Sequence, residues 1–302
     1  MRKLFSCLII LGLLVLFLGF LWSQRGSALD FVDDVQRRVE APTPVAFSEV
    51  QKLENVESVK NAEDVEIVEI VENVDGGVGE TNEISLPEEN DPTPTDKSTI
   101  STPSTISTDL PAEFNLAVPF TSQTPLGNWD VVHEETCEEA ALYMIHKFYE
   151  GETADKIDPE TAETDLMKIV EFEKALFGFF ESTTATQIAV LAEQMYGYER
   201  AEVVTDPTIE DLKKFIAAGY PVIVPSAGRL LGNPNFSGEG PLYHALVLKG
   251  YTDTTFITND PGTRRGSDYQ YDFATIMNAM HDWNDGDVLN GAKVVVVVYP
   301  NE

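Results

Sequence analysis

The chain has 302 residues, of which 51 are acidic and 20 are Lys or Arg, so its formal net charge at pH 7 is −31. This excess of negative charge excludes binding to nucleic acid or to an anionic membrane surface through a general electrostatic field. Two cysteines are too few for a disulfide framework, and Cys7 lies in an apolar run whereas Cys137 lies far from it. Cys137 is therefore an unpaired thiol whose presence needs an explanation.

The first 28 residues have the features of a membrane anchor. Arg2 and Lys3 precede an apolar run from Leu4 to Trp22, which is long enough to span a bilayer and long for a signal peptide. Positive charge before such a run favours a cytoplasmic N-terminus. We expect a signal-anchor helix in the cell membrane, with the rest of the chain outside the cytoplasm. Cleavage after the small residues 26–28 would instead give a secreted protein.

Residues 29–113 have the composition of a linker. Their first part is acidic and dotted with valine, and their second part is rich in Pro, Ser and Thr. Chains with so many like charges and so few large apolar residues do not bury enough surface to fold. The sequence therefore predicts a disordered linker without packed structure between the anchor and a domain at 114–302.

Helical periodicity and end signals predict five helices in this domain. Their expected ranges are 136–149, 159–177, 185–196, 209–218 and 273–281. Runs rich in β-branched and aromatic residues predict strands at 220–227, 244–251, 254–260 and 293–300. Helices that come first and strands that come afterwards indicate an α+β domain with an antiparallel sheet.

Cys137 opens the first of these helices and is a candidate nucleophile. The helix dipole at its N-terminus favours the thiolate. His244 begins a later strand and Asp260 ends the next one, so they can act as base and as orienter of the base through His Nδ1. Gln123 lies in a turn-rich loop upstream, where its amide and the Cys137 backbone N–H could stabilise an oxyanion.

Each of these residues also has a structural interpretation. Cys137 could be a small buried apolar residue, and His244 a hydrogen-bonded strand residue. Asn259 is an alternative orienter, and His133 an alternative base. His146 and His281 are expected to be structural. Glu138 and Glu139 suit the first turn of a helix, but their negative charge disfavours a neighbouring thiolate.

Several motifs together resemble one known family. They are VPFTSQ, NWD and CEEAAL in the first part of the domain, then PVIVP, GPLYHALVLKGY and ITNDPGT. In this combination the chain resembles the bacteriocin-processing-peptidase-like cysteine peptidases over about Ala117–Tyr299. The resemblance implies a papain-like fold with Cys137 as nucleophile, His244 as base, Asp260 as third member and Gln123 in the oxyanion hole. Glu138 stands where glycine is common in members that cut leader peptides after paired glycines.

The sequence thus predicts a membrane-tethered cysteine peptidase that acts on peptides or proteins and needs no cofactor. A catalytically silent domain that binds peptides or cell-wall fragments is one alternative, and an amidase or acyltransferase acting on wall peptides is another. The acidic stretch Asp282–Asp287 only partly matches a calcium loop, so we expect a charged turn and no metal site there.

Overall fold

The computed structural model describes residues 41–52 and 110–301 of the chain. The predicted membrane anchor at 1–28 and most of the predicted linker at 29–113 lie outside these ranges. Within them, no helix combines the length and apolar character needed to cross a membrane.

Three of the five longer helices begin at side-chain caps. The α-helices from residue 137 onward are α3 (Cys137–Tyr149), α4 (Pro159–Phe177), α5 (Ala185–Tyr196), α6 (Ile209–Ala217) and α7 (Phe273–Ala279). Short 3-10 turns are η1 (His133–Glu135), η2 (Gly228–Leu231) and η3 (Val288–Asn290). Asp158 caps α4 through its side chain, and Thr184 and Thr208 form capping boxes on α5 and α6. Gly178 and Gly197 end α4 and α5 in the left-handed conformation, so these helix ends were readable from the sequence.

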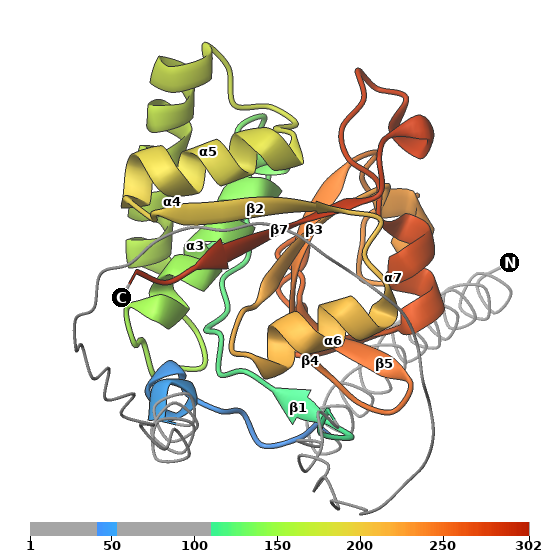
Figure 1. Cartoon of the computed structure of the whole chain (residues 1–302). Coiled ribbons are helices and arrows are strands. Elements are labelled where there is room, and N and C mark those ends of the chain that lie inside the picture. The colour runs from blue at the N-terminus through green and yellow to red at the C-terminus, as the bar shows by residue number, and fades with distance from the viewer. Residues whose placement is uncertain (1–40, 53–109, 302) are drawn as a thin grey trace, which may run out of the picture. The chain divides into compact units, whose positions relative to one another are not determined.

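One antiparallel sheet runs through the domain. Its strands are β1 (Phe114–Asn115), β2 (Arg200–Thr205), β3 (Val222–Ser226), β4 (His244–Tyr251), β5 (Thr255–Asn259), β6 (Tyr269–Asp272) and β7 (Val294–Tyr299). Their order is β2-β7-β3-β4-β5-β6, and β1 pairs with the far end of β4 (Figure 1). The predicted α+β class with an antiparallel sheet is confirmed.

The expected succession of helices followed by strands is wrong, because β2 lies between α5 and α6. Sequence patterns missed β2 because it is an edge strand that pairs only with β7, and its side chains are half-buried or exposed. They also missed β6, which has four residues and follows a turn. Neither strand carries the long apolar run by which strands were predicted.

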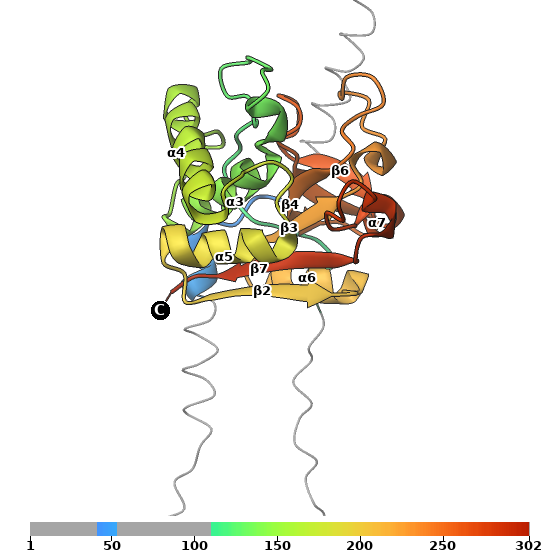
Figure 2. The same ribbon diagram turned by 90° about the horizontal axis from the view of Figure 1, so that it is seen from above.

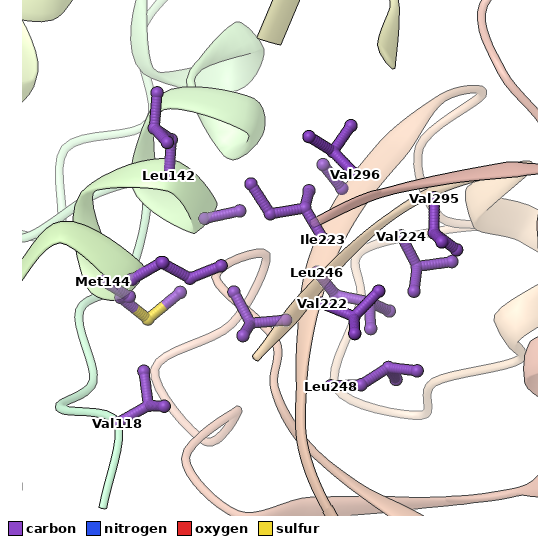
Figure 3. Packing of buried hydrophobic residues seen from close by; sticks show 14 of the residues in the cluster. Val118, Leu142, Met144, Val222, Ile223, Val224, Leu246, Leu248, Val295 and Val296 are labelled. Carbon is purple, nitrogen blue, oxygen red and sulfur yellow. The ribbon is translucent and has the colours of Figure 1, made fainter. Parts of the chain in front are cut away.

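The central strands are buried on both faces. Every residue of β3 and β4 is buried, as are Val294–Val298 of β7. Helix α3 packs against β3 and β4, α6 packs against β4, and α5 packs against β2 and β7 (Figure 2). In Figure 3, Ile223 lies on the side of the strands that faces Leu142 and Met144 of α3, whereas Val224 and Val295 lie on the other side. Helices that cover both faces explain why these strands are continuous apolar runs.

Residues 41–52 pack on the domain, so the prediction of an unpacked linker is wrong for this segment. Val45 exchanges backbone hydrogen bonds with Asn115 and Ala117 beside β1. The rings of Phe47 and Phe148 pack together with their centroids 5.4 Å apart. Val50 is buried against Gly219, where a Cβ would collide with the valine side chain. A few apolar residues in an acidic stretch thus suffice to dock it, because the domain offers a complementary surface.

Candidate active site

Cys137 occupies the first position of α3 and is 5% exposed. Its Sγ donates a hydrogen bond to Glu138 Oε2 at 2.9 Å. Burial raises the pKa of the Cys137 thiol well above its usual value, and the negative charge of Glu138 raises it further. The backbone N–H of Ala245, the residue after His244, faces the sulfur and acts in the opposite direction. The sulfur is therefore a protonated thiol in this arrangement, and it lies beside the start of β4.

His244 begins β4, opposite Ser226 of β3, and is 1% exposed. Its Nε2 lies 2.8 Å from Asp260 Oδ1. We expected this contact to use Nδ1, and that expectation is wrong. The turn after Asp260 passes along the ring, where a Cβ on Gly262 would lie 2.8 Å from His244 Cε1, and this path brings the carboxylate to Nε2. Because Nε2 is occupied, Nδ1 is the nitrogen left for another partner.

Asp260 is fully buried and each of its oxygens is hydrogen-bonded. Oδ1 accepts from His244 Nε2 and from the Gly262 N–H, and Oδ2 accepts from Tyr271 at 2.6 Å and from Asn233 at 3.0 Å. Burial alone would raise the pKa of this carboxyl, but the charge of His244 and these hydrogen bonds outweigh burial and lower it. Asp260 is thus held as a carboxylate beside the imidazole.

Gln123 is buried and connects three segments. Its backbone N–H donates to the Pro261 carbonyl at 2.9 Å, just beyond Asp260. Its side-chain Nε2 donates to the carbonyls of His133 at 2.7 Å and Glu134 at 3.2 Å. The side chain thus fixes the loop that leads into α3, and both of its N–H bonds are engaged. Its expected orientation toward an attacked carbonyl is not the one in this structure.

A cleft of about 1130 Å³ lies beside Cys137, His244 and Gln123. Gln123, Cys137, Glu138 and His244 lie along its wall, and Gly262 belongs to the same wall. Its rim carries exposed apolar side chains, namely Leu126, Trp129 and Leu242. A cleft with apolar walls and a few converging polar groups is the usual form of a substrate site.

Comparison with known proteins places this domain in a family. A family model described as "Peptidase_C39 like family" matches residues 115–285. The chain belongs to this family. A solved structure described as a C39-like peptidase from Bacillus anthracis is similar, with 18% sequence identity and a TM-score of 0.42 over 63% of this chain and 99% of that one. A search of curated proteins finds no match.

In this C39-like domain three of the four predicted site residues, Gln123, Cys137 and His244, line one cleft, and Asp260 is buried behind His244. His244 and Asp260 are hydrogen-bonded, and Cys137 lies beside Ala245 of the same strand. Among the described contacts, the Cys137 thiol bonds to Glu138 and not to the imidazole. Gln123 lines the cleft but points its amide at backbone carbonyls.

The alternative residues have other partners. Asn259 Nδ2 donates to the carbonyls of Val118 and Pro119, so it holds the segment before Gln123, and the hydrogen-bonded carboxylate partner of His244 is Asp260. His146 stacks on Tyr196 with ring centroids 3.8 Å apart. His281 Nδ1 lies 3.0 Å from the Gly291 carbonyl. These two histidines have structural contacts away from the cleft, as expected.

His133 lies between two carboxylates. Its Nδ1 is 2.7 Å from Asp130 Oδ1, and its Nε2 is 3.0 Å from Glu163 Oε1 on α4. Hydrogen bonds from the His133 backbone and ring lower the pKa of Asp130 to about 2. Each nitrogen of the ring thus faces a carboxylate oxygen within hydrogen-bond distance. His133 therefore ties the turn before Cys137 to α4, and its carbonyl receives the Gln123 amide.

Glu138 and Glu139 do not point into solvent. Glu138 is 1% exposed and lines the cleft, and Glu139 is fully buried beside Glu173 of α4. Burial raises the pKa of each of these carboxyls, and that of Glu173 reaches about 8. Carboxyls so buried and so close to each other are held largely in the neutral form.

Sequence reasoning missed the residues that support Asp260. Asn233 lies just after η2, in the long loop before His244, and Tyr271 lies in the unpredicted strand β6. No local motif marks either residue, because their partner Asp260 is 27 and 11 positions away. The glycine in the Asp-Pro-Gly turn was visible, but its closeness to the imidazole was not.

Proposed function

We propose that this domain is a cysteine peptidase that hydrolyses peptide bonds with Cys137, His244 and Asp260. The observation that supports the proposal is the buried His244–Asp260 pair beside Cys137. His244 begins β4, and the backbone N–H of the next residue, Ala245, faces the sulfur of Cys137. A thiol, an imidazole and a carboxylate in this order supply a nucleophile, a base and a group that orients the base.

The role of each ring nitrogen of His244 follows from its hydrogen bonds, because Nε2 is held by Asp260 and Nδ1 is left for the thiol. His244 Nδ1 takes the proton of the Cys137 thiol, and the sulfur attacks the carbonyl carbon of the substrate. The imidazolium then returns the proton to the leaving amine, which departs and leaves a thioester. Water, deprotonated by the same nitrogen, hydrolyses the thioester. Throughout this cycle Asp260 holds Nε2–H, and Tyr271 and Asn233 hold Asp260.

The oxyanion of the tetrahedral intermediate would be stabilised by the Cys137 backbone N–H and the Gln123 amide. One Gln123 N–H must first leave its carbonyl partner. The bond to the Glu134 carbonyl, at 3.2 Å, is longer than the bond to the His133 carbonyl at 2.7 Å. We infer that substrate takes the place of Glu134, while His133 continues to hold the side chain.

The substrate is a peptide or a protein, and the apolar rim of the cleft suits an extended chain with large side chains. No nucleic acid partner is proposed, because the net charge of −31 opposes one. The segment 1–28 anchors the protein in the cell membrane, so that the domain acts outside the cytoplasm. The proposed proton transfers and the thioester steps use no cofactor or metal.

A library of diverse peptides, incubated with purified full-length protein and followed by mass spectrometry, tests the proposal. We expect cleavage products that gain the mass of one water. Cys137→Ala and His244→Ala should lower the cleavage rate by about 10³-fold or more. His281→Ala, a histidine outside the cleft, should cleave like the wild type. Equal rates in wild type and Cys137→Ala would refute the assignment.

A binding domain without catalysis remains the second candidate, because the thiol is protonated and bonded to Glu138 in this structure. It requires that the library yields no products and that Cys137→Ala binds peptides as tightly as the wild type. Transfer of the acyl group to an amine would instead give products heavier by the amine, so the same spectra separate amide transfer from hydrolysis.

A further inference from the structure

The contact between Cys137 and Glu138 is the least expected feature of the cleft. The carboxyl oxygen lies 2.9 Å from the atom that would attack the substrate. Glu138 is 1% exposed, and its other oxygen, Oε1, has no hydrogen-bond partner in the described part of the chain. An ionised carboxylate with an unsatisfied buried oxygen costs much more free energy than the neutral acid does.

The charges around Glu138 act in the same direction. Titratable groups from several elements face Glu138. They are Cys137 and Glu139 on α3, Glu135 on η1, Glu173 on α4, Tyr243 before β4, and His244 across the cleft. Asp282 is in turn hydrogen-bonded to Tyr243. All of these groups except His244 are acids, which are either neutral or negatively charged. Burial first, and Glu139 second, raise the pKa of Glu138 well above its usual value. Loss of the thiol proton and loss of the Glu138 proton thus oppose each other, because this region tolerates little negative charge.

We propose that Glu138 is a further catalytic residue, which shares a proton with Cys137 and, when protonated, donates a hydrogen bond from Oε2 to the thiolate. The inference rests on the proposed function and deepens it. The step balances as follows: the thiol proton moves to His244 Nδ1, the sulfur becomes the thiolate, and the Glu138 proton stays on Oε2 and turns toward the sulfur. The carboxyl is regenerated unchanged when the thioester forms.

An ionised Glu138 has the opposite effect, because its charge then lies against the sulfur. The thiolate forms readily only while Glu138 keeps its proton, so the protonation state of this one carboxyl controls the pH at which the reactive nucleophile appears. Two groups that interact this closely titrate as a pair, and loss of the first proton is divided between them. The reactivity of the thiol toward an alkylating agent should therefore rise with pH in two steps separated by a plateau.

The experiment measures the rate of alkylation by iodoacetamide against pH, in full-length protein that carries Cys7→Ser so that Cys137 is the single cysteine. In the wild-type background we expect the two-step curve. Glu138→Gln keeps a hydrogen-bond donor of the same shape but cannot ionise, so its curve should rise in a single step. At the pH of the wild-type plateau, Cys137 of the Glu138→Gln variant should react about tenfold faster than Cys137 of the wild type, which corresponds to a thiol pKa lower by about one unit.

Glu135→Gln is the matched control, since it removes a charge from the same wall without touching the sulfur. It should keep both steps. Glu138→Ala removes the donor as well as the charge, so it should lose about tenfold in alkylation rate relative to Glu138→Gln at every pH below the wild-type plateau. A single step in the wild-type curve overturns the proposal even if Glu138→Gln does not fold. Parallel wild-type and Glu138→Gln curves overturn it as well.

This readout is independent of peptide cleavage. If the peptide library yields no products, the proposed peptidase activity fails, and a two-step alkylation curve would still support the shared proton. If cleavage occurs and kcat/KM keeps the same pH dependence in Glu138→Gln as in the wild type, the peptidase stands and the role of Glu138 falls.

Discussion

The two halves of the cleft are built in opposite ways. On the strand side, Asp260 is an ionised carboxylate whose oxygens receive four hydrogen bonds, from His244, Gly262, Tyr271 and Asn233. On the helix side, Glu138, Glu139 and Glu173 are buried carboxyls with several oxygens that accept no hydrogen bond in the described residues. Carboxyls that are similarly buried therefore differ in pKa, which is lowered at Asp260 and raised at Glu138 and Glu139.

The difference shows that the facing imidazole of His244 and the hydrogen-bond donors, and not burial, decide whether a carboxyl in this domain is charged. Four donors keep Asp260 ionised, so the imidazole is oriented before substrate arrives. The helix side provides few donors, so its protons are retained and the sulfur stays a thiol. The strand side is prearranged, and the helix side responds to pH.

The largest effect is expected from removal of the Asp260 carboxylate. Asp260→Ala leaves His244, Tyr271 and Asn233 without their shared partner in a buried place. We expect a loss of about 3–5 kcal/mol in the free energy of unfolding, measured by urea denaturation. Peptide cleavage should fall by at least about 10²-fold. Tyr271→Phe removes one of the donors and should cost about 1.5–3 kcal/mol. Equal costs for the two variants would contradict the view that Asp260 is the centre of this network.

The helix side should make the protein less stable as pH rises. Glu173 has a pKa of about 8 in the folded protein against an ordinary value of 4.5. Between these pH values the folded protein holds a proton that the unfolded chain has lost, so stability falls as pH increases through this range. Asp260 has the opposite sign, because its lowered pKa gives stability that is lost only as pH falls through the folded value.

Glu173→Gln tests this assignment, because an amide cannot lose the proton. Urea denaturation at pH 5 and pH 8 should show that the wild type loses stability on the order of a few kcal/mol between them, and that the variant loses less. Glu171→Gln, on the same helix and exposed, serves as the control. A wild type that is equally stable at both pH values would contradict the raised pKa of Glu173 in the folded protein.

A smaller effect is expected from Gly262→Ala, which alters the prearranged side without removing a polar group. A Cβ here would lie 2.8 Å from His244 Cε1, so the ring must tilt away from its position between Asp260 and the cleft. We expect kcat to fall about tenfold while KM changes little, because the substrate still binds but the base is displaced. The free energy of unfolding should fall by about 1–3 kcal/mol. An unchanged kcat would mean that the histidine position is not critical.

The smallest effect is expected at His133, which lies outside the reacting atoms. His133→Ala removes the hydrogen bond from the ring to Asp130 but leaves the one from the His133 backbone N–H, so the Asp130 pKa should rise from about 2 part of the way toward its ordinary value of 3.8. Carboxyl chemical shifts followed by NMR would measure this change. Val131→Ala, on an exposed neighbouring side chain, should leave the Asp130 pKa unaltered. A low Asp130 pKa in His133→Ala would show that backbone N–H groups alone hold the carboxylate.

Local signals in the sequence were sufficient for most of the fold. The caps at Asp158, Thr184 and Thr208 marked helix starts, and continuous apolar runs marked β3, β4 and β7. The strands β2 and β6 and the packed segment 41–52 were missed, because their stability comes from partners distant in the sequence. In each case the segment itself is short or polar and has no periodic apolar face.

For the candidate site, residue types were readable but their contacts were not. The order of Cys137, His244 and Asp260 could be interpreted because helix and strand boundaries placed them. Which nitrogen of His244 contacts Asp260 depends on the path of the turn at Gly262. The Glu138 contact depends on how the first turn of α3 sits against β4. Such details arise from packing between elements, and no single stretch of sequence contains them.

If residues 1–28 anchor the protein, the docked segment 41–52 limits how far the domain can lie from the membrane. Without docking, an anchor that ends at residue 28 would be joined to the domain by residues 29–109, which reach roughly 280 Å when fully extended. With Val45 and Val50 held on the domain, only residues 29–40 separate the anchor from the folded unit. Twelve residues extend about 40 Å at most. For a protein anchored at 1–28, the cleft would then work close to the membrane surface, and its substrates would have to be found there.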